Sequence, residues 1–96
     1  MYDSQIEKML VISTAHVTKE TATALDRRGA TMGGLLSYPH GEYGWMFYIA
    51  YVEKVDEDIV PDELMAAARY AQGLGCTWLL LDRDAGAIAD LPTWEW

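Results

Sequence analysis

"CTWLLLD" (residues 76–82) is a short and almost wholly apolar segment, which is typical of a β-strand buried on both faces. The segment before it predicts a helix, because Pro61 suits the first helical position and apolar residues recur at three and four positions from Leu64 to Leu74. The segment after it, residues 83–96, has no periodic pattern, so we expect a loop and an extended C-terminal tail.

The first half of the chain predicts a similar alternation of elements. "KMLVISTA" (8–15) is rich in β-branched residues and predicts a strand, and residues 19–28 predict a helix with Thr18 as its N-cap. "TMGGLLSY" (31–38) predicts a weaker strand, because its glycine pair loosens it, and "WMFYIAYVE" (45–53) predicts a strong one. A hairpin loop should join these two strands.

The resulting order, β-α-β-β-α-β in a single globular domain of residues 1–96, is that of the ferredoxin-like sandwich. We therefore predict an α+β fold in which an antiparallel sheet carries two helices on one face. In this topology the segments that follow 45–53 and 76–82 leave the sheet at the same end, so their carboxylates should converge. The turn with His16 and the hairpin with His40 should meet at the opposite end.

Composition and charge exclude several classes of partner. The chain has 15 acidic and 7 basic residues, with a formal net charge of −8. Such a charge repels phosphates, so we expect no direct binding to nucleic acid and no binding to an anionic membrane. It favours a basic protein surface instead. A lone cysteine, Cys76, and the lack of a long apolar segment fit a soluble protein of a reducing cytoplasm.

Asp82 and Asp84 follow the apolar segment directly and form an Asp-x-Asp motif. Phosphatases of the haloacid dehalogenase type present a nucleophilic carboxylate beside a magnesium ligand in this way. The supporting groups of such a site are missing here, because only residues 85–96 follow the motif and no lysine lies after Lys54. We therefore expect these two carboxylates to bind no catalytic metal.

His16 and His40 are the remaining candidates for acid–base chemistry, if their two loops meet. No nucleophile elbow, phosphate-binding loop or EF-hand spacing accompanies them. We therefore expect a protein that is not an enzyme and has no cofactor. A small-ligand-binding or enzymatic domain that uses the two histidines remains an alternative.

Aromatic residues are abundant for so small a core. Alternation puts Tyr48 on the opposite side of its strand from Trp45 and Tyr51, so part of this set should occupy the sheet face without helices. Trp94 and Trp96 lie two positions apart, so in an extended tail both rings point to one side. We expect the tail to cover the protein's own sheet or that of a dimer mate.

Three segments together resemble a family of small, uncharacterised proteins from bacterial plasmids, prophages and other mobile elements, known as a domain of unknown function. They are "VISTAHVTKETATALD", "YGWMFYIAYV" and "AQGLGCTWLLLDRD…LPTWEW", and their most specific parts are residues 13–16 and 91–96. The resemblance implies no activity and no catalytic residues. It implies an origin on a mobile element, where many small acidic proteins antagonise host defence.

The function expected from the sequence is that of a small acidic, non-enzymatic protein-binding module. We expect it to inhibit a bacterial defence system of the CRISPR or restriction type, by binding the basic surface of a nucleic-acid-binding complex. A structural module that forms a homodimer through its sheet is a further alternative. The candidate partner-binding residues are Glu53, Asp56, Glu57, Asp58, Asp62, Glu63, Asp82, Asp84, Trp94 and Trp96.

Overall fold

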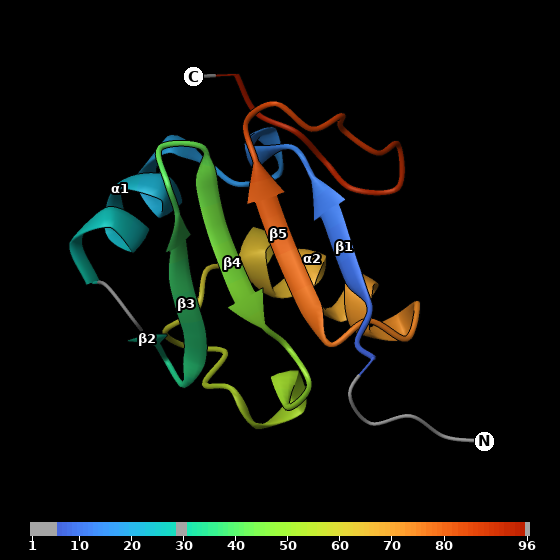
Figure 1. The fold of residues 1–96 in the computed structure, drawn as a ribbon. Helices are drawn as coiled ribbons and strands as arrows, with labels where there is room; N and C mark the ends of the chain where they lie inside the picture. The colour runs from blue at the N-terminus through green and yellow to red at the C-terminus, as the bar shows by residue number, and fades with distance from the viewer. Residues whose placement is uncertain (1–5, 29–30, 96) are drawn as a thin grey trace.

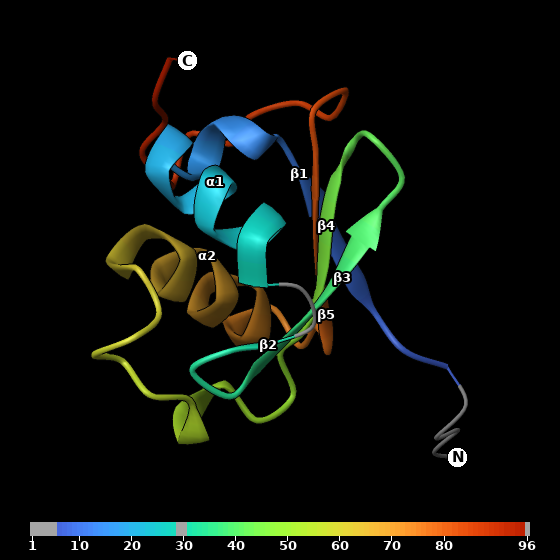
Figure 2. The same cartoon turned by 90° about the vertical axis from the view of Figure 1, so that its left-hand side faces the viewer.

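A computed structural model describes residues 6–28 and 31–95 of the chain as an α+β domain (Figure 1). Its mixed sheet contains β1 (Met9–Ile12), β2 (Thr31–Met32), β3 (Leu35–His40), β4 (Gly44–Tyr48) and β5 (Trp78–Asp82). The helices are α1 (Lys19–Arg28) and α2 (Asp62–Gly73), with the short 3-10 helices η1 (Thr14–His16) and η2 (Val52–Lys54). Both long helices pack on one face of the sheet, and no helix among the described residues covers the other face (Figure 2).

The order of strands differs from the ferredoxin-like prediction. The observed order is β1-β5-β4-β3-β2, so β1 lies at an edge and β5 separates it from β4. The first and last long strands, β1 and β5, are neighbours and run parallel, whereas every other pair is antiparallel, contrary to the predicted antiparallel sheet. The sheet is therefore mixed, and the predicted ferredoxin-like order is wrong. The two helices on one face are confirmed.

The apolar content of the two strands gives a physical reason for this order. Leu79 and Leu81 are fully buried in the core and Leu80, on the opposite side of the strand, is only 8% exposed, so β5 gains most from a central position with a strand on each side. In β1 the side chains of Met9 and Val11 are exposed, which an edge strand tolerates. The order of elements along the chain carries no information on this choice, because it fits both arrangements.

Several strands are shorter than the sequence predicts. Gly33 and Gly34, with φ of 58° and 89°, form a two-residue turn that splits the predicted strand 31–38 into β2 and β3. In contrast, β3 continues to His40, so the hairpin loop is shorter than predicted. The chain also leaves β4 at Tyr48 and turns into η2, which ends the predicted strand 45–53 early.

The helices agree closely with the sequence prediction. The helix α1 spans 19–28 as predicted, and the Thr18 hydroxyl oxygen accepts a hydrogen bond from the Thr21 backbone N–H at 3.2 Å, as an N-cap does. The helix α2 begins directly after Pro61. Its apolar side packs with α1 and the inner sheet face around Phe47, which is fully buried. This single core positions both ends of the sheet, where the charged segments lie.

We expect Gly44→Ala to destabilise the fold by more than about 2 kcal/mol, because a Cβ at this position would overlap the backbone carbonyl of Leu81 in β5. Gly73→Ala is a suitable control, since no atom lies within 4 Å of its added Cβ. In a helix this change should be neutral or stabilise by about 0.5–1 kcal/mol. Urea denaturation measures both effects, and equal stability of the two variants would contradict the close approach of β4 and β5.

Candidate functional site

The two acidic segments lie at opposite ends of the sheet, contrary to the predicted convergence. Strands β4 and β5 are antiparallel neighbours, with Gly44 opposite Asp82 and Tyr48 opposite Trp78. The segment after β4 therefore begins where β5 starts, and Asp82 lies where β4 starts. Because β5 pairs directly with β4 instead of being separated from it by β1, the acidic residues form two distant groups.

The larger group lies in the connection between β4 and α2. We call Glu53, Asp56, Glu57, Asp58 and Asp62, all exposed, the acidic connection. Its backbone is held in place, because the Asp56 N–H donates to the Gly33 carbonyl oxygen at 2.8 Å and the Asp56 carboxylate accepts from the Asp58 N–H at 2.9 Å. The carboxylates thus project from an ordered turn next to the β2–β3 hairpin.

A hollow of about 480 Å³ lies beside the acidic connection. Four carboxylates border it, together with Arg69, which forms an ion pair with Glu57. The pKa of Glu53 is lowered below its ordinary value, mainly by a hydrogen bond from the Gln72 side chain and to a smaller extent by one from the backbone N–H of Glu53. The hollow is lined by Val52, Glu53, Val55, Asp56, Glu57, Asp58, Arg69 and Gln72.

Glu63 has a structural role that the sequence did not reveal. Its carboxylate, at the start of α2, accepts hydrogen bonds from the Thr18 backbone N–H at 3.0 Å, from the Thr18 hydroxyl at 3.1 Å and from the Thr21 hydroxyl at 2.5 Å. It therefore caps α1 from another helix. Burial would raise the pKa of Glu63, but these hydrogen bonds outweigh it and lower the pKa below 4.5.

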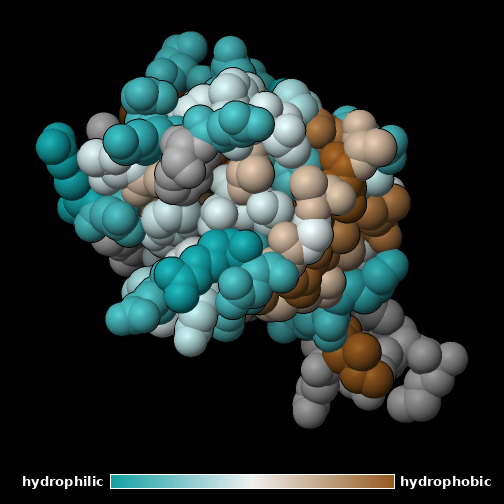
Figure 3. All heavy atoms as spheres, turned by 90° about the horizontal axis from the view of Figure 1, so that it is seen from above, coloured by the Kyte–Doolittle hydropathy of each residue, from teal (hydrophilic) through white to brown (hydrophobic). Residues whose placement is uncertain are grey.

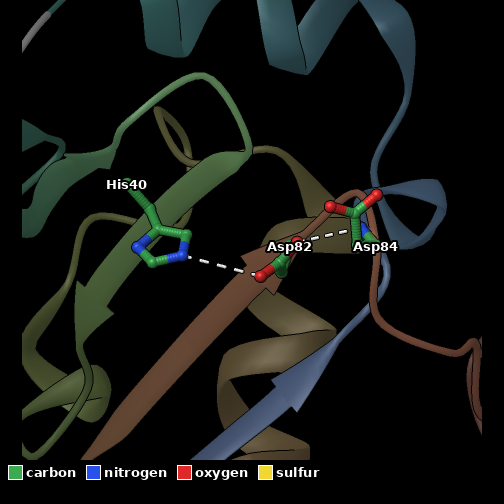
Figure 4. A network of polar contacts seen from close by, with 3 residues as sticks. All are labelled: His40, Asp82 and Asp84. Carbon is green, nitrogen blue, oxygen red and sulfur yellow. Dashed lines mark hydrogen bonds and ion pairs between the residues drawn. The ribbon is translucent and has the colours of Figure 1, made fainter.

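The smaller acidic group, at the end of β5, lies beside the β3–β4 hairpin (Figure 4). One carboxylate oxygen of Asp82 accepts a hydrogen bond from the Asp84 N–H at 2.8 Å, and the other lies 3.5 Å from His40 Nε2. The intervening Arg83 lies over the Tyr43 ring, with 4.8 Å from the guanidinium carbon to the ring centroid. Asp82 thus closes a turn with one carboxylate oxygen and faces His40 with the other. The two carboxylates of Asp82 and Asp84 are not arranged to hold a metal ion together.

His16 and His40 lie toward the same end of the sheet, but each ring has its own partners. The His16 ring is 1% exposed and is held between two backbone groups of the C-terminal segment. Its Nε2 accepts from the Ile88 N–H at 3.0 Å, and its Nδ1 lies 2.9 Å from the Pro92 carbonyl oxygen, to which it donates. The predicted histidine pair is replaced by a buried structural histidine and a surface histidine beside Asp82.

The C-terminal segment packs against η1 instead of the open sheet face. The Ser13 N–H donates to the Gly86 carbonyl oxygen at 3.1 Å, and the Trp94 N–H donates to the Ala15 carbonyl oxygen at 2.8 Å. Trp94 remains 37% exposed, and Trp96 lies outside the described residues. Residues 13–16 and 91–95, the described parts of the two segments most specific to the resemblance, therefore contact each other. The prediction that the tail covers the sheet of its own chain is wrong for residues 86–94, whereas contact of the tail with a dimer mate stays a prediction.

The part of the chain that the structure describes contains neither a cluster of metal ligands nor a membrane-spanning helix. Within residues 6–28 and 31–95, no three His, Cys, Asp or Glu side chains are arranged to hold a metal ion. In the same ranges, no helix has the length and apolar composition needed to cross a lipid bilayer.

We expect Glu63→Gln to lower the free energy of unfolding by about 1–2 kcal/mol at pH 7, because α1 loses a charged cap that is half-buried. A lowered pKa in the folded state makes this contribution complete above pH 4.5 and removes it as the pH falls through the folded pKa. The difference from the wild type should therefore shrink below pH 4.5. Asp62→Asn, at the exposed neighbouring position, is the control and should lose about 0.5 kcal/mol. A pH-independent loss at position 63 would contradict the capping role.

We expect His16→Ala to release the C-terminal segment and to cost about 2–4 kcal/mol of stability, because two backbone groups lose their partner and a cavity forms. Hydrogen exchange measures the release directly at the Ile88 amide, which donates to the ring. His40→Ala, at the exposed histidine, is the matched control and should leave that amide protected. Unchanged protection of the Ile88 amide in His16→Ala would show that the His16 ring does not hold the C-terminal segment in place.

Comparison with known proteins places the chain in a family without assigning an activity. No curated protein and no solved structure is significantly similar to it. Residues 9–96 match the C-terminal domain of DUF5983, a family of unknown function. This range includes every described helix and strand, both acidic groups and the segment that packs on His16. The chain therefore belongs to the DUF5983 family.

Proposed function

We propose that the protein is a non-enzymatic binding module that attaches to a basic surface of another protein through the acidic connection. The observation that carries this proposal is the ordered group of exposed carboxylates around the hollow beside α2. Concentrating like charges in one region costs free energy at low salt, which a protein needing only solubility avoids by spreading them. A basic partner offsets this repulsion on binding.

We restrict the residues proposed for binding to those of the acidic connection. Glu63 is removed, because its carboxylate is used by Thr18 and Thr21. Asp82 and Asp84 are removed as well, since they lie at the other end of the sheet and close a turn. The acidic connection remains, and its charges should act together, through the rate and salt dependence of association.

The partner class we propose is a nucleic-acid-binding protein of a bacterial defence system, in the host cytoplasm. Such a protein carries a basic cleft for phosphates, and ordered carboxylates on a small domain are able to occupy it in place of the nucleic acid. An origin on a mobile element is part of the same proposal and rests on the resemblance of residues 13–16 and 91–96. A role of this kind requires binding alone and no catalytic group.

We expect the triple variant Glu53→Gln, Glu57→Gln, Asp58→Asn to lose about tenfold in capture of basic proteins from a bacterial lysate, because the local field that attracts them is removed. The substitutions change the formal net charge from −8 to −5 (three carboxylates neutralised) and leave the Asp56 turn intact. Mass spectrometry of proteins eluted at low and high salt identifies and quantifies the captured set.

The matched control neutralises three exposed carboxylates elsewhere, through Glu20→Gln, Glu42→Gln and Glu95→Gln, and reaches the same net charge. This control should retain capture at the salt dependence of the wild type. Equal losses in both variants would show that net charge alone governs capture. Retained capture in the first variant, with an unchanged melting temperature, would exclude the acidic connection as the binding surface.

A further inference from the structure

The sheet face that carries no helix presents a continuous apolar surface. Strand register places its side chains in two rows across four strands, and we call these eight residues the open face. The first row is Met9, Trp78, Tyr48 and Leu36, and the second is Val11, Leu80, Met46 and Tyr38. None of the eight is charged, in a chain with 15 acidic and 7 basic residues.

The assignment of these residues to one face is supported from both sides of the sheet. Their neighbours in sequence, such as Leu79 and Phe47, are fully buried in the core under the helices. On the open face the aromatic rings contact one another, with ring centroids 4.9 Å apart for Tyr48 and Trp78 and 6.1 Å apart for Tyr38 and Trp78. The Trp78 indole N–H donates to Glu7 at the margin, so its ring is held in place.

Among the described residues, the two margins of the open face are exposed to solvent, whereas Leu80 near its centre is 8% exposed. Four of its members are about two-fifths exposed, namely Met9 at 39%, Val11 at 46%, Leu36 at 39% and Tyr38 at 40%. The C-terminal segment does not cover it, because residues 86–94 bond to η1. Seen from above, hydrophobic residues form a band along one side of the molecule (Figure 3).

We propose that a second copy of this chain covers the open face, in a homodimer formed by stacking the two sheets. Four strands about 4.8 Å apart, with two rows of side chains, present about 400–500 Å² of apolar surface. Two copies stacked about 10 Å apart then bury at most about 800–1,000 Å² in total, which is at or below the lower limit of a specific interface and fits a weak, reversible dimer. Stacking at this size needs an equally apolar partner surface, and a second open face provides one.

The distribution of side chains across the open face suits twofold symmetry. Its β1 margin is aliphatic, with Met9 and Val11, whereas its β3 margin carries Leu36 and Tyr38. A twofold axis along the strands, between the two sheets, places each β1 margin against the β3 margin of the other copy and the central rings against each other. Tyr51, 61% exposed and 6.2 Å from the Tyr48 ring, extends the contact at one end.

Charge sets the expected affinity and its response to salt. Two chains of net charge −8 repel each other, and high salt screens this repulsion. The dimer should therefore be weak at low salt and tighter at high salt, the reverse of binding to a basic partner. The inference does not depend on the proposed function, although a dimer would present two acidic connections to one partner and so increase avidity.

Sedimentation equilibrium of the full chain, at about 0.15 M and 1 M NaCl, tests the inference. We expect reversible monomer–dimer association whose Kd falls at least threefold at the higher salt concentration. Val11→Glu and Tyr38→Glu, on opposite margins of the open face, should each raise the Kd at least tenfold, because they bury an unpaired charge. Ile59→Glu is the control, since Ile59 is 47% exposed but lies in the β4–α2 connection, and it should leave the Kd unchanged.

Circular dichroism and thermal melting of each variant separate loss of the interface from loss of the fold. A wild-type chain that stays monomeric at several hundred micromolar at both salt concentrations would overturn the proposal. A dimer that persists in folded Val11→Glu and Tyr38→Glu would also overturn it. Capture of basic proteins by a monomeric chain would leave the proposed function standing, whereas salt-strengthened dimerisation without capture would remove that function alone.

Discussion

Strand β5 is the constraint on which the rest of the architecture depends. It pairs with β1 on one side and β4 on the other, and Leu79 and Leu81 fix its inner face in the core. Because β4 and β5 are antiparallel neighbours, the end of β4 lies beside the start of β5. The acidic connection, which follows β4, is therefore at the opposite end of the sheet from Asp82. The close approach at Gly44 makes the pairing intolerant of even a single added carbon.

His16 joins an N-terminal and a C-terminal segment of the chain at one end of the sheet. It lies on η1, directly after β1, and its ring holds the segment that follows β5, so the parallel pair β1–β5 is closed by a buried polar contact. A buried ring with both nitrogens bonded specifies one arrangement of the chain, because any other leaves polar groups unpaired. Glu63 provides the same kind of constraint between α1 and α2. The sequence offered His16 for acid–base chemistry and Glu63 for partner binding, whereas the structure places both side chains in hydrogen bonds that hold the fold together.

The surface divides into two regions with opposite physical character. The acidic connection is polar, charged and built on a turn anchored to Gly33, whereas the open face is uncharged and built on four strands. Binding of the acidic connection to a basic partner weakens as the salt concentration rises. Stacking of two open faces strengthens, because salt screens the repulsion between the two negatively charged chains. Salt dependence therefore assigns any observed interaction to one of the two regions.

The sequence by itself determined the helices, the presence of the strands, the excess of acidic charge and the aromatic character of one sheet face. These features follow from local periodicity, capping residues such as Thr18, and composition, which act over a few residues. It did not determine the order of the strands or the grouping of the carboxylates, because both depend on which strands pair over long separations in the chain. The partners of His16 and Glu63 lie 72 and 45 residues away, at Ile88 and Thr18. Only the tertiary structure decided these contacts, since burial and hydrogen bonding across the core, and not local propensity, select them.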